Sequence, residues 1–111
     1  TNQGLCALRA AIYLSAMGPE GLKKTALQCA AGARFLKGLL MDKGIAPVFS
    51  APVFHEFVIP MLEDRLNELK STGIVPGVLV SGQYPEIPGS VLVTVTEMNT
   101  QEECRWLAAN M

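Results

Sequence analysis

The chain has 111 residues, half of them hydrophobic, and its formal net charge is −1. This length suits one domain, and this share of apolar residues is enough to build a core, which excludes a disordered segment. The near-neutral balance supplies no basic face for nucleic acid, and the longest apolar run is shorter than the roughly 20 residues that cross a bilayer.

The opening stretch, Thr1–Leu22, predicts a helix that is apolar on every side. Between Gln3 and Met17 only Arg9 is charged, and such a helix must be buried all round. A chain this short has little material for that. We therefore expect the protein that covers this helix to lie outside the chain, and the chain to be a piece of something larger.

A second helix is expected from about Pro19 to Asp42. Gly18 should end the first helix in a left-handed conformation, and proline suits the first position of the next one. Lys43 and Gly44 form a flexible stop. An apolar stripe with alternating spacings of four and three runs along this helix: Leu22, Ala26, Cys29, Ala33, Leu36 and Leu40.

Pro47, Pro52 and Pro60 exclude helix from the region that they span. Ala46–Ser50 is predicted as a short edge strand, and Phe54–Ile59 as a longer strand that Pro60 ends. Met61–Ser71 carries leucines at helical spacing among charged residues, which predicts a surface helix. A glycine, Gly73, should cap it.

Two further strands are predicted, at Gly77–Ser81 and at Ser90–Thr96, where valine or leucine alternates with other residues. Gly82–Gly89 holds two glycines and two prolines and is expected to be a loop.

Thr100 should cap a last helix, with Glu103 completing a capping box. Trp106 and Leu107 are expected to anchor that helix.

This element order predicts an α+β fold: two N-terminal helices, then a small, mostly antiparallel sheet with helices on one face. We expect a single domain over residues 1–111, with a helical part over 1–44 and a sheet part over 45–111.

The cysteines and the single histidine supply few reactive groups. Cys6, Cys29 and Cys104 are odd in number and widely spaced, which argues against a zinc site or a disulfide framework and predicts buried free thiols in a reducing compartment. His55 titrates near neutrality, but the adjacent Glu56 should point to the opposite face of its strand. Both a structural and an acid–base role for the histidine stay open.

Four groups of residues, in order along the chain, resemble the glycine-cleavage P-protein family. They are Thr1-Asn2-Gln3 with Arg9 and Gly18–Leu22, then Phe54–Phe57, Gly82–Glu86, and Thr96-Glu97 followed by Thr100–Glu103. The resemblance covers nearly the whole chain. It is to subunit 1 of the two-chain glycine dehydrogenase (decarboxylating), of which this chain would be the C-terminal end.

The resemblance implies the small C-terminal domain of an aspartate-aminotransferase-like enzyme that depends on pyridoxal phosphate. It implies a cytoplasmic bacterial or archaeal holoenzyme that decarboxylates glycine and passes the aminomethyl group to the lipoyl arm of the H-protein. The implied partners are subunit 2, the H-protein and the large domain of the same subunit. Because the cofactor lysine would belong to subunit 2, this chain alone should bind no cofactor and catalyse nothing.

Thr1 and Asn2 are the candidate cofactor-binding residues. Either side chain can cap the first helix, and capping alone explains them. A helix amino end also suits anions, and the resemblance implies that the loop ahead of this helix approaches the cofactor phosphate of a neighbouring subunit. The single-chain P-protein tends to carry alanine where Asn2 stands, which weakens an essential role for this residue and favours the two-chain form.

The remaining polar candidates have plain structural explanations. Tyr84 and Glu86 lie in a loop that is either a binding loop or a proline-stiffened connection. No Ser/His/Asp set exists, so no catalytic residue is expected. The lysines lie on charged helix faces or at helix ends, away from any predicted site: Lys23, Lys24, Lys37, Lys43 and Lys70.

Two other functions remain open. A free-standing α+β module that binds a ligand or regulates an enzyme would have a start codon near Thr1. Another aspartate-aminotransferase-like enzyme would carry a cofactor lysine shortly upstream of that residue.

Overall fold

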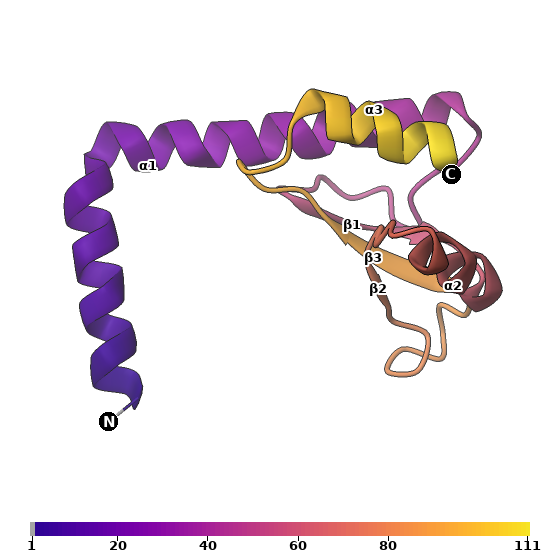
Figure 1. Cartoon of the computed structure of the whole chain (residues 1–111), viewed down its shortest axis with the longest axis horizontal. Coiled ribbons are helices and arrows are strands. Elements are labelled where there is room, and N and C mark those ends of the chain that lie inside the picture. The colour runs from indigo at the N-terminus through magenta and orange to yellow at the C-terminus, as the bar shows by residue number, and fades with distance from the viewer. Residues whose placement is uncertain (1) are drawn as a thin grey trace.

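The computed structural model describes residues 2–111 and confirms an α+β fold, with helices over one face of a small antiparallel sheet (Figure 1). The elements in chain order are α1 (Asn2–Asp42), β1 (Glu56–Pro60), α2 (Glu63–Ser71), β2 (Val78–Leu79), β3 (Ser90–Thr94) and α3 (Gln101–Asn110).

Helix α1 is two helical segments joined at a sharp break. Gly18 has φ 63° and ψ 178°, and Pro19 follows it, so the predicted break is confirmed. The conformation differs from the left-handed helical cap that we expected, because ψ places Gly18 in a region that is open essentially only to glycine. Proline then begins the second segment. The two segments run at a steep angle to each other (Figure 1).

The first segment of α1, residues 2–17, projects away from the rest of the molecule (Figure 1). Its large apolar side chains are about half exposed or more, for example Leu5 at 59%, Ile12 at 60% and Leu14 at 49%. No described residue therefore shields this apolar helix from water. The expectation that its cover lies outside the chain agrees with this exposure.

The second segment of α1 packs on the sheet and on α3. Cys29, Ala33, Leu36 and Leu40 are buried, as the stripe predicted. Leu22 belongs to the same stripe but is exposed, because the stripe begins before the helix reaches the sheet. The helix ends at Asp42, just ahead of a glycine with positive φ.

The sheet has the order β1-β3-β2, and both pairings are antiparallel. Phe57 pairs with Val93 and Ile59 with Val91, and all four side chains belong to the core. This face of the sheet meets the helices. The sheet is the only one among residues 2–111.

Each of the four predicted strands is shorter in the structure or absent. Ala46–Ser50 is not a strand, because a single bond, from the Val48 amide to the Val58 carbonyl at 2.8 Å, is its only backbone link to β1. The strand predicted at Gly77–Ser81 shrinks to β2. Strand β3 stops two residues before Thr96, whose amide donates to the Asn99 side chain instead of continuing the ladder.

The strand predicted at Phe54–Ile59 begins late, at Glu56, and it includes Pro60, which pairs with Ser90. Helix α2 is confirmed, with Leu66 and Leu69 buried and Gly73 at φ 85° after it.

Helix α3 begins with the predicted capping box. The Glu103 amide donates to Thr100 Oγ1 at 3.1 Å, and the Thr100 amide donates to Glu103 Oε2 at 2.7 Å. The prediction that Trp106 anchors this helix is wrong, because its side chain is 54% exposed, whereas Leu107 packs against the core as predicted. Cys104 and Ala108 are buried instead, and their small side chains let α3 approach α1 closely.

Among residues 2–111, no helix combines the length and the apolar character that crossing a membrane requires.

Replacing Gly77 by alanine is expected to destabilise the chain. A Cβ atom there would lie 2.1 Å from the Leu92 carbonyl oxygen and 2.8 Å from Val91 Cγ1, so β2 would have to move away from β3. We expect a loss of about 1–3 kcal/mol in the free energy of unfolding, measured by urea titration. Gly82→Ala is the control, since its Cβ would meet nothing within 4 Å. Equal midpoints for Gly77→Ala and the parent chain would contradict the predicted clash.

The 111-residue chain is expected to self-associate through Leu5–Leu14 in the first segment of α1, because an apolar surface this large is rarely left in water. The double variant Leu8→Asp/Ile12→Asp should then sediment as a monomer at low micromolar concentration. Met98→Asp, at a site 78% exposed on the β3–α3 connection, should associate like the parent. A parent chain that is already a clean monomer would refute this expectation.

Candidate functional site

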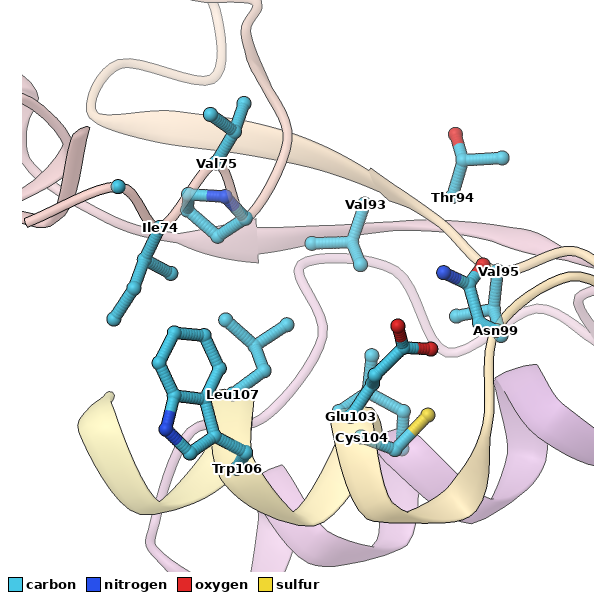
Figure 2. A pocket seen from close by; sticks show the side chains of 13 residues that line it. Ile74, Val75, Val93, Thr94, Val95, Asn99, Glu103, Cys104, Trp106 and Leu107 are labelled. Atoms are coloured by element: carbon cyan, nitrogen blue, oxygen red, sulfur yellow. The ribbon is translucent and has the colours of Figure 1, made fainter.

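A cavity of about 230 Å³ lies between β3, α3 and the chain that follows α2 (Figure 2). Its walls are largely apolar and include Leu36, Ile74, Val75, Val93, Trp106 and Leu107. Ligand pockets usually measure roughly 300 Å³ or more, so this cavity is small for a cofactor. The sequence held no signal for it, since its walls come from four separate parts of the chain.

Two polar side chains of this cavity, Glu103 and Asn99, are already hydrogen-bonded within the chain. Glu103 Oε2 accepts from both the amide and the hydroxyl of Thr100, at 2.7 and 3.2 Å. Asn99 Oδ1 accepts from the Thr96 amide at 2.9 Å. These side chains shape the turn before α3 and cap the helix, which explains their presence without a ligand.

The two buried thiols are poor nucleophiles. Burial raises the pKa of Cys104, and the nearby Glu103 carboxylate raises it further. Burial also raises the pKa of Cys29, which donates a hydrogen bond from Sγ to Glu97 Oε2 at 3.4 Å. Because the thiolate is the reactive form, both thiols are less reactive than an exposed cysteine. The third cysteine, Cys6, is free but exposed, so the expectation that all three are buried is wrong for it.

His55 lies beside Glu56, contrary to the prediction that the two point to opposite faces. Histidine Nε2 is 3.9 Å from Glu56 Oε1. The alternation of side chains fails here because β1 begins only at Glu56. Histidine Nδ1 is buried and has no hydrogen-bond partner among the described residues, and the ring meets Phe54 edge-on at 4.7 Å.

This group does not form a nucleophilic triad. The Thr94 hydroxyl donates to Glu56 Oε1 at 3.1 Å, so its proton points to the carboxylate and not to His55. In a Ser-His-Asp arrangement the hydroxyl donates to the imidazole. The geometry supports a polar cluster at the end of the sheet and no acyl-transfer chemistry.

The predicted cofactor-binding residues remain a prediction. Thr1 lies outside the described residues. Asn2 is exposed and is the first residue of α1. The polar cluster around His55 lies at β1 and not on α1, so the structure does not bring it together with Asn2.

The lysines present do not fit a pyridoxal-phosphate Schiff base. None of them lines the cavity beside α3. Lys37 is half-buried and the other four are exposed on α1, after its end, or on α2.

The loop after β2 is an ordered connection. The Tyr84 amide donates to the Val80 carbonyl at 2.9 Å, and the Ile87 amide donates to the Tyr84 carbonyl at 3.1 Å. Tyr84 and Glu86 both keep exposed side chains.

Comparisons with known proteins agree over the whole chain. The family described as glycine cleavage system P-protein matches residues 1–111. A probable glycine dehydrogenase (decarboxylating) subunit 1 from Moorella thermoacetica is 43% identical over 100% of this chain and 26% of its own length. The corresponding protein of Nitrosospira multiformis is 44% identical over 90% of this chain and 23% of its own.

A solved structure gives the same result. The crystal structure of a glycine decarboxylase (P-protein) of the glycine cleavage system, in inhibitor-bound form, superimposes with a TM-score of 0.86 and 32% identity. It covers 99% of this chain, and the match takes up 26% of that protein. This chain thus spans about a quarter of the length of the relatives it matches, and it belongs to the glycine cleavage system P-protein family.

Proposed function

We propose that this chain is the C-terminal small-domain part of subunit 1 of a two-chain glycine dehydrogenase (decarboxylating). The assembled enzyme would decarboxylate glycine and transfer the aminomethyl group to the lipoyl group of the H-protein. The observation that carries the proposal is the likeness to a P-protein crystal structure over 99% of the chain at a TM-score of 0.86.

Apart from Thr1 and Asn2, the chain's role in that enzyme would be structural. Its buried thiols have raised pKa values, and Glu103 beside its cavity caps α3. Pyridoxal phosphate would supply the electron sink for glycine decarboxylation, and its lysine would be on subunit 2, because the lysines here do not fit. Residues 1–44 would join this part to the large domain, and residues 45–111 would form the sheet part.

The proposed partners follow from the exposed surfaces and from the names of the relatives. Those relatives are called subunit 1, which supports a second subunit for this protein as well. The exposed first segment of α1 supports burial against the large domain of the same subunit. Free, buried thiols suit a reducing compartment, so we place the enzyme in the cytoplasm.

Thr1 and Asn2 would lie where the subunits meet. The amino end of a helix of this length attracts anions through its free amides and its dipole. A hydroxyl at position 1 would hydrogen-bond to the phosphate of the neighbouring subunit's cofactor. Asn2 would contribute less, since helix capping alone explains it.

The test is a decarboxylation assay with full-length subunit 1, subunit 2 and the H-protein. Thr1→Ala is expected to raise the apparent Kd for pyridoxal phosphate about tenfold, because one hydrogen bond to a charged group contributes about 1.5 kcal/mol or more. Asn2→Ala should change it about twofold or less, as a lost helix cap alone would.

Two controls complete the assay. The 111-residue chain mixed with subunit 2 should give no decarboxylation, and full-length subunit 1 should restore it. Unchanged cofactor affinity in Thr1→Ala would remove the inter-subunit role of that residue. No activity from the full-length mixture would remove the proposed function.

A further inference from the structure

The cavity beside α3 contains one charged group that capping uses only in part. Of the described residues that line it, only Glu103 is charged, and its carboxylate points from α3 into the space between α3 and β3 (Figure 2). Capping occupies Oε2, which accepts from the amide and the hydroxyl of Thr100. The other oxygen, Oε1, accepts no hydrogen bond from residues 2–111. The cavity therefore has a negatively charged acceptor that the fold does not use.

The end of the sheet supplies a second acceptor. The Val95 amide donates to the His55 carbonyl at 2.8 Å, on the β1 side of β3. Because backbone groups alternate between the two edges of a strand, the Thr94 amide and carbonyl face the opposite edge. The register of β2 with β3, continued by two residues, places Pro76 opposite Thr94. Proline has no amide hydrogen, so it leaves the Thr94 carbonyl without a donor, and both residues line the cavity.

An exposed aromatic ring lies one helical turn from the carboxylate. Trp106 follows Glu103 by three residues, so the two side chains share a face of α3. The indole ring points into the same space (Figure 2). Its side chain is 54% exposed, so packing within this chain does not explain it. The face of an indole attracts a cation through the quadrupole of the ring.

The electrostatics of the cavity favour a positive ligand. No basic side chain lines it among the described residues. The pKa of Cys104, in the same wall, is raised first by burial and then by the Glu103 carboxylate, so the field of this carboxylate reaches the wall. A carboxylate or a phosphate would be repelled there, and an ammonium group would be attracted.

The size and the walls of the cavity restrict the rest of the ligand. Its volume of about 230 Å³ is below the roughly 300 Å³ at which ligand pockets usually begin, so the ligand must be small. Ile74, Val75 and Leu107 offer an apolar wall to its body. A primary ammonium group carries three N–H donors, which suit two protein acceptors and one water molecule.

We propose that this cavity binds a small primary alkylammonium ion. Its nitrogen donates to Glu103 Oε1 and to the Thr94 carbonyl, and its alkyl chain lies against Leu107 and the ring of Trp106. The inference does not rest on the proposed function, because it uses only the geometry and charge of residues 73–107.

A binding titration with n-butylammonium chloride tests the proposal. The protein is full-length subunit 1 without pyridoxal phosphate, and the apparent Kd is measured at pH 7 by saturation-transfer NMR. n-Butanol has the same alkyl chain without a charge, and butyrate carries the opposite charge. Both should bind at least fivefold more weakly than n-butylammonium.

Three variants assign the binding to this cavity. Glu103→Gln should raise the Kd about fivefold or more, because hydrogen bonds to an ionised acceptor are about twice as strong as neutral ones. Glutamine still completes a capping box, so α3 should stay intact. Trp106→Leu should raise the Kd about threefold through the lost cation–π contact. Glu102→Gln is the matched control, since Glu102 is also in the first turn of α3 but does not line the cavity, and it should change the Kd about twofold or less.

The same titration can overturn the proposal. Equal Kd values for Glu103→Gln and Glu102→Gln would show that the ion responds only to the general negative charge of the surface. Butyrate that binds as tightly as n-butylammonium, or a parent protein that shows no saturation transfer, would also refute the site. If Glu103→Gln lowers the thermal midpoint, Trp106→Leu decides the question, because its side chain is half exposed.

The readout is independent of decarboxylation. A subunit that binds n-butylammonium in this way but supports no activity keeps the site and removes the proposed function. An active enzyme whose subunit 1 does not bind the ion keeps the function and removes the site.

Discussion

The close approach of the second segment of α1 to the sheet is the contact on which the described fold depends. Ala33 is fully buried there, and a methyl group added at Gly32 would lie 2.9 Å from Val95 Cγ1. Small residues let the helix sit low on the strands, so Leu36 and Leu40 reach the core. Each such leucine contributes about 1.5–3 kcal/mol when fully buried, and a larger residue at position 32 would push the helix away.

This packing uses one face of the sheet and leaves the molecule unequal on its two sides. Helix α3 joins α1 on the covered face, where Cys104 and Ala108 are buried. On the other face Ser90 is buried and Val58 and Leu92 are half-buried, while Val78 is 64% exposed. The exposed apolar residues of the first segment of α1 are unexplained by the folding of this chain alone and are explained by burial against further protein.

Local signals in the sequence were the ones that predicted structure correctly. The Gly18-Pro19 break depends on the conformational limits of two adjacent residues, and the capping box at Thr100 and Glu103 depends on one helical turn. Both depend on neighbouring residues alone, so tertiary packing does not decide them. The strand at Ala46–Ser50 failed because a strand needs a partner's hydrogen bonds, and β1 offers this segment only one.

Features that depend on contacts between distant parts of the chain could not be predicted from the sequence, for a related reason. The rotation of α3 about its axis decides whether Trp106 or Cys104 faces the core, and that rotation is set by how closely α1 approaches. The cavity could not be predicted from the sequence either, because residues that line it lie up to about seventy positions apart (Leu36 to Leu107). His55 lies close to Glu56 because strand β1 begins one residue after the histidine.

The break at Gly18 is a local signal with a long-range consequence. A glycine at φ 63° followed by proline restricts the direction in which the first segment leaves the second, because proline fixes its own φ and restricts the residue before it. A flexible linker would let the apolar helix fold back onto its own chain. A stiff break holds the first segment away from the rest of the chain, and so keeps its apolar side chains available to further protein.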